Sequence, residues 1–234
     1  MSRYLQAFSI LFYLGSGVLL CAQELRQIEF TVYGQYPIRG DVEYQPVGKE
    51  AIAAGAKAED PVSVRTHSLS RTGPYSYKGG NRISFYDSLS NETVGEVTLP
   101  QGSTRWLLVF VKNTFQDKGS ANVLKYKIYP FDDSRRNLPG NGLVFLNLSG
   151  MALSGKLGDE TIELTPGESE PFLIAENLQI SLWTPDHYKQ KLLPAHIKNY
   201  SFQRNHRYLM ILFPPVLKGS ADIDVRFLNE PLKL

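Results

Sequence analysis

The chain has 234 residues, of which 42% are hydrophobic, and it carries 25 basic and 23 acidic side chains. This near-neutral balance, with no basic stripe along the sequence, argues against nucleic acid as a partner, while the hydrophobic content is sufficient for a packed core. Cys21 is the only cysteine, so the chain can form no internal disulfide.

Residues 1–22 are predicted to be a secretory signal peptide. A single arginine precedes an apolar run over residues 7–20, which is interrupted by glycine and serine and is shorter than the roughly 20 apolar residues of a membrane span. We expect cleavage before Gln23, which exports the mature chain, without a transmembrane segment, to the periplasm, the cell surface or the exterior. The alternative is lipoprotein processing, in which Cys21 becomes a lipid-anchored N-terminus, but the leucine before it argues against that pathway.

The first half of the mature chain has the pattern of an all-β protein, with short apolar segments separated by Gly, Pro, Asn and Asp. Residues 28–33 alternate between apolar and polar. Residues 75–77 and 83–85 are expected to form a hairpin, with the glycines of residues 78–81 at the positive φ angles of its turn. Residues 105–111 are apolar on both faces, which favours a central strand covered on both sides, with a buried helix as the alternative.

The second half repeats this pattern. Turn signals occur at Gly158-Asp159, Pro166-Gly167 and Asn205, and strand spacing of roughly 8 to 12 residues favours a sandwich or a barrel. The predicted strands are residues 143–148, 153–157, 161–164, 178–183, 208–213 and 223–227.

The mature chain is predicted to contain two immunoglobulin-like β-sandwich domains in tandem, residues 23–130 and 131–234, because a strand gives way to a polar stretch near residue 130. One larger two-sheet sandwich is the alternative. Residues 100–108 and 203–210 each join a polar turn to a strongly apolar strand, which is compatible with duplication. An alanine-rich segment, residues 49–60, is expected to be a surface insertion, either a helical turn or a mobile loop.

No residue cluster predicts catalysis, a metal site or a cofactor. The four histidines include no closely spaced pair, and there is neither a nucleophile elbow nor a phosphate-binding glycine loop. Two acidic pairs, Asp132-Asp133 and Asp222 with Asp224, are expected to be structural, the second on the solvent face of an edge strand. A hydrolase that uses Asp132 and Asp133 is the enzyme alternative.

Aromatic residues are the better candidates for ligand contact, because sugar rings stack on exposed aromatic faces. We single out Tyr75, Tyr77 and Trp183 as tentative contacts, with Tyr86 as a further candidate. Tyr75 and Tyr77 share one face of their strand, so they form either a small platform or part of the core, and the core is favoured. Trp106 lies within an apolar run and is expected to be buried.

Residues 138–140, 145–150, 155–158 and 164–167 form a Gly- and Pro-punctuated pattern. This pattern, over about the central third of the chain, resembles that of uncharacterised exported β-sandwich proteins of environmental bacteria. The resemblance implies an exported β-sandwich and brings no catalytic residues with it.

Together these features predict an exported, non-enzymatic binding or structural-assembly protein of the cell envelope or extracellular space. Its expected partner is an envelope or extracellular protein, or a polysaccharide. A glycan-binding module that uses exposed aromatic residues is the first alternative and the hydrolase is the second.

Overall fold

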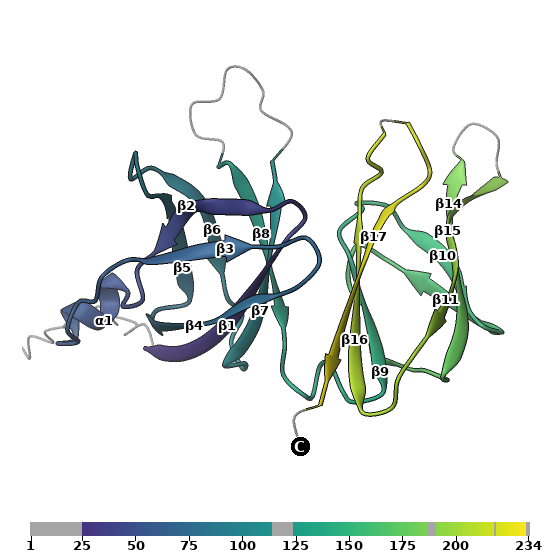
Figure 1. Ribbon diagram of the computed structural model, residues 1–234, viewed down its shortest axis with the longest axis horizontal. Helices are drawn as coiled ribbons and strands as arrows, with labels where there is room; N and C mark the ends of the chain where they lie inside the picture. The colour runs from purple at the N-terminus through teal and green to yellow at the C-terminus, as the bar shows by residue number, and fades with distance from the viewer. Residues whose placement is uncertain (1–24, 114–123, 187–190, 218, 233–234) are drawn as a thin grey trace, which may run out of the picture.

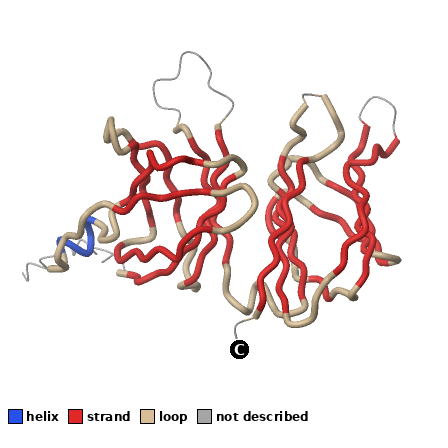
Figure 2. The backbone as a smooth tube through the Cα atoms, in the orientation of Figure 1, coloured by secondary structure: helices blue, strands red, loops and turns tan. Residues whose placement is uncertain are grey.

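The computed structural model describes residues 25–113, 124–186, 191–217 and 219–232 (Figure 1). The predicted signal peptide and Cys21 lie outside the described residues. Their regular secondary structure is almost entirely β-strand, with one short helix (Figure 2), so the all-β prediction is confirmed.

The elements follow the chain in two groups. The first contains β1 (Arg26–Gly34), β2 (Ile38–Tyr44), α1 (Lys49–Ala53), β3 (Val62–Thr66), β4 (Thr72–Gly79), β5 (Arg82–Asp87), β6 (Thr93–Thr98), β7 (Arg105–Lys112) and β8 (Tyr126–Asp132). The second contains β9 (Gly142–Asn147), β10 (Leu153–Leu157), β11 (Glu160–Leu164), β12 (Gly167–Glu168), β13 (Phe172–Leu173), β14 (Asn177–Asp186), β15 (Lys191–Ser201), β16 (His206–Phe213) and β17 (Asp224–Pro231).

These strands form four sheets, two in each half of the chain. Sheet A has the order β4-β1-β7-β8 and sheet B the order β3-β2-β5-β6. Sheet C has the order β12-β9-β16-β17, with β13 also paired to β9, and sheet D the order β11-β10-β14-β15. The first strand of each half is parallel to the penultimate one, β1 to β7 and β9 to β16. The two sandwiches therefore share one topology strand for strand, which supports duplication.

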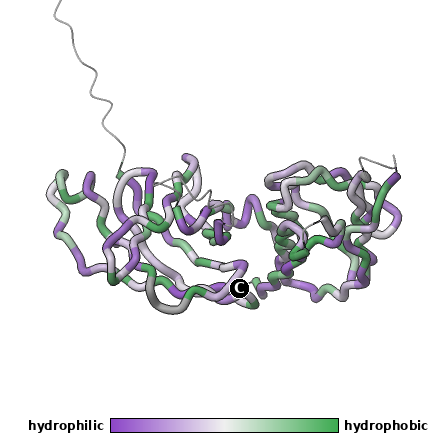
Figure 3. Tube along the Cα trace, turned by 90° about the horizontal axis from the view of Figure 1, so that it is seen from above, coloured by the Kyte–Doolittle hydropathy of each residue, from purple (hydrophilic) through white to green (hydrophobic). Residues whose placement is uncertain are grey.

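Three hydrophobic cores hold the four sheets in the stack B–A–C–D (Figure 1). The first lies between sheets B and A, the second between sheets C and D, and the third between A and C, where the two sandwiches meet. The third core consists of Tyr33, Leu107, Val109, Phe131, Leu138, Val144, Leu146, Leu209, Ile211, Phe213 and Leu228. Figure 3 shows that hydrophobic positions occur throughout both halves.

The third core explains why the central strands are apolar on both faces. In β7, Trp106, Leu108 and Phe110 belong to the first core, while Leu107 and Val109 belong to the third. The predicted central strand is therefore confirmed, and the buried helix at this position is excluded.

The predicted hairpin of residues 75–77 and 83–85 is wrong. β4 pairs with β1 in sheet A, whereas β5 pairs with β2 and β6 in sheet B, so the connection crosses between sheets. Gly79 does not have a positive φ. A Cβ at Gly79 would overlap the ring of Tyr77, so this glycine permits close packing rather than a tight turn.

The six strands predicted in the second half are confirmed, although β15 was not anticipated because its lysines, proline and histidine mask the alternation. At the predicted domain boundary, β8 continues to Asp132 and residues 133–141 connect it to β9. The alanine-rich segment begins with the helical turn α1, which buries Ala51.

Candidate functional site

Trp183 lies on the outer face of sheet D, the last layer of the stack. Its neighbours on β14, Ile180 and Leu182, belong to the second core, and successive strand residues point to opposite faces. Trp183 is partly exposed and is absent from that core. Tryptophan is usually buried or hydrogen bonded in a protein of this size, so an outward tryptophan on an open sheet is a candidate contact residue.

The strand register places Trp183 in a row of four residues across sheet D. Trp183 pairs with Ser154 of β10 and with Pro194 of β15, and Ser154 pairs with Glu163 of β11. The Ser154 hydroxyl donates a hydrogen bond to Glu163 Oε2 at 3.2 Å. We call Glu163, Ser154, Trp183 and Pro194 the D row.

The outer face of sheet B contains a row of the same composition. Tyr86 of β5 pairs with Glu43 of β2 and with Thr93 of β6, and Glu43 pairs with Ser63 of β3. The Ser63 hydroxyl donates a hydrogen bond to Glu43 Oε1 at 3.1 Å. We call Ser63, Glu43, Tyr86 and Thr93 the B row.

The two rows occupy equivalent positions in the shared topology. β5 corresponds to β14 and β6 to β15, and in both pairs the register shifts beside the aromatic residue, between Phe85 and Tyr86 and between Leu182 and Trp183. The extra residue of each bulge, Val94 or Ala195, is buried. A β-bulge changes the direction of neighbouring side chains, so the same irregularity accompanies the outward aromatic residue in each outer sheet.

Each row combines an aromatic ring with a hydrogen-bonded serine and glutamate on the adjoining strands. The order of serine and glutamate is reversed between the rows. The glutamate lies on β2 and the serine on β3 in the B row, whereas the serine lies on β10, which corresponds to β2, and the glutamate on β11 in the D row. A ring face offers apolar contact, and the carboxylate and hydroxyl can bond to ligand hydroxyl groups. Each row itself contains one carboxylate and no cation.

Tyr75 and Tyr77 do not form an exposed platform. Tyr77 is only 4% exposed within the first core, and burial raises the pKa of Tyr77 to about 12. Tyr75 packs against the same core, with its ring stacked on Phe30 at a centroid distance of 5.4 Å. Trp106 is buried as predicted, and its indole N–H donates to the Ser103 carbonyl at 3.2 Å. Of the three singled-out residues, Trp183 alone faces solvent.

The carboxylates of Asp132 and Asp133 have separate structural partners. Asp132 accepts hydrogen bonds from the Ser103 hydroxyl at 2.7 Å and the Ser134 backbone N–H at 2.9 Å. Asp133 is buried and contacts Arg71 Nη1 at 2.8 Å and Arg207 Nη2 at 3.1 Å. The pair therefore does not point into one shared acid–base site.

Asp133 belongs to a closed ring of alternating charges between the sandwiches, which we call the ion ring. Arg207 also contacts Glu230 Oε2 at 2.6 Å, and Glu230 Oε1 lies 2.8 Å from Arg71 Nε, which closes the ring. Burial disfavours the charged form of Arg207, but the carboxylates of Asp133 and Glu230 outweigh it and raise the pKa of Arg207. The ion ring lines a cleft of about 380 Å³. It joins Arg71 of the first half to Arg207 and Glu230 of the second, together with Asp133, the first residue of the connection between them.

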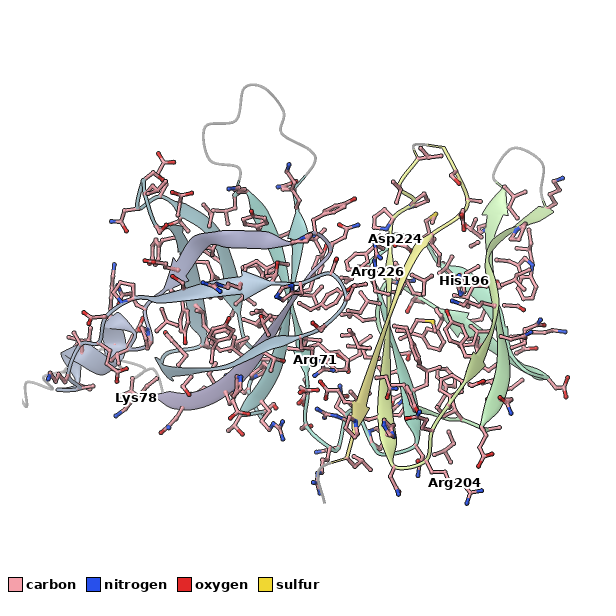
Figure 4. All side chains as sticks on the ribbon, viewed as in Figure 1. Arg71, Lys78, His196, Arg204, Asp224 and Arg226 are labelled. Carbon is pink, nitrogen blue, oxygen red and sulfur yellow. The ribbon has the colours of Figure 1, made fainter. Side chains whose placement is uncertain are left out.

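Asp224 also lies at the junction of the sandwiches, where Figure 4 shows it beside Arg226. Its Oδ2 is 3.0 Å from Arg226 Nη2, and its side chain is only 10% exposed. The predicted solvent position of Asp224 is therefore wrong, because the outer face of β17 is covered by sheet A. Asp222 precedes β17 rather than lying in it.

Among the described residues, no group of three His, Cys, Asp or Glu side chains is arranged to hold a metal ion. His187 lies outside these residues. His196 Nε2 lies 2.9 Å from the Tyr200 hydroxyl, and burial, aided by Lys198, lowers the pKa of His196.

No protein-family model matches the chain, and no curated protein matches it in sequence. In the parts of the chain that the structure describes, no helix is long and apolar enough to cross a membrane.

Proposed function

We propose that this chain is an exported, non-enzymatic binding protein of the cell envelope or extracellular space, and that the outer faces of sheets B and D are its contact surfaces. The observation that carries this proposal is the recurrence of an outward aromatic residue beside a Ser–Glu pair, at equivalent register positions, in the B row and the D row.

A polysaccharide is the partner class that this chemistry favours. The flat ring of Tyr86 or Trp183 suits the C–H face of a sugar, and the neighbouring glutamate and serine suit its hydroxyl groups. Because each row carries one negative charge, a neutral polysaccharide fits better than an acidic one. The proposal also includes the immunoglobulin-like character of the two sandwiches and the export of the chain.

The test is affinity electrophoresis of the mature chain from Gln23 through gels that contain β-1,3-glucan, β-1,4-glucan, xylan or alginate. We expect retardation by at least one neutral polysaccharide and none by alginate. The double variant Tyr86→Ala/Trp183→Ala should lose the retardation, while Tyr36→Ala, which removes an exposed tyrosine from the β1–β2 connection, should keep it.

Retardation of the double variant equal to that of the unsubstituted chain would exclude these two rows as the contact surfaces. If no polysaccharide retards the chain and cross-linking in cells captures an envelope protein through position 86 or 183, the assembly function replaces glycan binding. A hydrolase has less support, because the carboxylates of Asp132 and Asp133 are occupied by hydroxyl, N–H and guanidinium groups. Mass spectrometry of the exported chain tests cleavage before Gln23 against lipidation of Cys21.

A further inference from the structure

We infer that the protein is bivalent: the B row and the D row each bind a neutral saccharide chain, so one molecule joins two chains. This inference rests on the proposed function and adds the number of sites, their relation in space and the consequence of having two.

The position of the rows in the stack separates the two sites. Sheets B and D are the outermost layers of B–A–C–D, at the two ends of the molecule (Figure 1). Packed sheets lie about 10 Å apart, so three intervals separate the outer sheets by roughly 30 Å. One short oligosaccharide lying on the B row therefore cannot also lie on the D row.

The junction between the sandwiches keeps the rows apart. The third core buries Leu107, Val109, Leu209 and Ile211 completely, and the ion ring adds buried charge contacts from both halves. An interface with a hydrophobic core and paired charges does not behave as a flexible linker. The two outer faces cannot turn toward the same ligand, and binding at both sites joins different chains or distant parts of one chain.

The equivalence of the rows indicates that both take the same class of ligand, with unequal strength. Trp183 has a larger ring than Tyr86, and its neighbour Pro194 adds apolar surface where the B row has the hydroxyl of Thr93. The D row should therefore be the stronger site.

The test uses the neutral polysaccharide that retards the mature chain in gels, in two formats. In solution, light scattering should rise as protein is added and fall again at excess protein, because each saccharide chain is then saturated by separate molecules. On a surface coated with the polysaccharide, protein bound through one row should capture added soluble polysaccharide through the other row, which faces away from the surface.

Three variants separate the possible outcomes. Tyr86→Ala and Trp183→Ala should each keep binding to a soluble tetrasaccharide of the same polysaccharide, at one site per molecule, but should lose the scattering peak. Tyr86→Trp should keep the peak and strengthen the B row. Far-ultraviolet circular dichroism of each variant checks that it is folded, and Tyr36→Ala serves as the matched tyrosine control.

Failure of bivalency differs from failure of the proposed function. If the unsubstituted chain binds one tetrasaccharide and the scattering peak is absent, the protein is a monovalent binding protein and this inference is overturned. If both single variants keep the peak, other surfaces join the chains, which also overturns it. If no saccharide binds at all, the proposed function itself fails.

Discussion

The two sandwiches repeat one topology but differ in how completely each strand position is built. β4 is continuous and pairs with β1 over most of its length, whereas the corresponding edge of sheet C consists of two short pieces, β12 and β13, separated by residues 169–171. Pro171 in this interval has no N–H to donate to a ladder. Both sandwiches keep the buried central strands β1, β7, β9 and β16, so the shared topology persists where an edge strand of sheet C is interrupted.

The largest change in the free energy of unfolding is expected when the ion ring that joins the two halves is broken. Asp133→Asn leaves Arg71 and Arg207 without their buried carboxylate and should lower the free energy of unfolding by about 3–5 kcal/mol, measured by urea denaturation. Glu230→Gln should cost less, because the Glu230 side chain is 30% exposed and that of Asp133 only 4%.

An exposed ion pair supplies the control. Glu176→Gln removes the contact between Glu176 and Arg204, whose side chains are 62% and 83% exposed, and should change the free energy of unfolding by less than about 1 kcal/mol. Equal losses for Asp133→Asn and Glu176→Gln would show that the ion ring does not stabilise the junction.

Substitutions in the third core should have the next largest effect, and they test whether the two sandwiches unfold as one unit. Leu107→Ala and Leu209→Ala remove fully buried side chains from equivalent strands of the third core, and each should cost about 2–5 kcal/mol. The chain has two tryptophans, Trp106 in the first sandwich and Trp183 in the second. In a Trp183→Phe background the fluorescence of Trp106 reports on the first half, and in a Trp106→Phe background that of Trp183 reports on the second. Each core substitution should lower the urea midpoint of both halves equally. A lower midpoint in the substituted half alone would mean that the halves unfold independently.

The smallest effect is expected at alkaline pH, where the two halves differ in the number of tyrosines whose pKa is raised by burial. Burial raises the pKa of Tyr33, Tyr44 and Tyr77 from 10.0 to about 12, whereas in the second sandwich Tyr200 shows this shift. Because these phenols ionise at lower pH in the unfolded chain, their stabilisation of the fold is complete below pH 10 and is lost as the pH rises toward 12.

Urea denaturation at neutral pH and at about pH 11 measures this loss. Tyr44→Phe, which removes the hydroxyl that donates to the Ser76 carbonyl at 2.9 Å, should make stability less sensitive to alkaline pH. An unchanged difference between the two pH values in Tyr44→Phe would contradict the role of this buried phenol.

The sequence predicts most of the strands but, of the two rows, only the aromatic residues Tyr86 and Trp183. Alternation and turn residues predict β1 and most strands of the second half, because one buried face leaves a local pattern, and the continuous apolar run predicts β7. Trp183 was singled out by its residue type, while Glu163 and Ser154 were missed. Nothing local marks them, since their proximity to Trp183 depends on the pairing of β10 with β11 and β14.

Local alternation does not decide which face of a strand is covered. The favoured core position of Tyr75 and Tyr77 is right and the solvent position of Asp224 is wrong, although all three lie in strands with the alternation of half-exposed strands. The first core covers the tyrosines, and sheet A covers the outer face of β17.

By itself, the sequence determined the all-β class, the strand positions and the double apolar pattern of the central strands, because these follow from side-chain alternation and turn chemistry within a few residues. The tertiary structure decided which strands pair, that the facing sides of sheets A and C form a third core, and that the aromatic rows lie on the outer faces of sheets B and D. Those outcomes depend on register and on sheet stacking, which bring together residues far apart in the chain and leave no periodic signal in it.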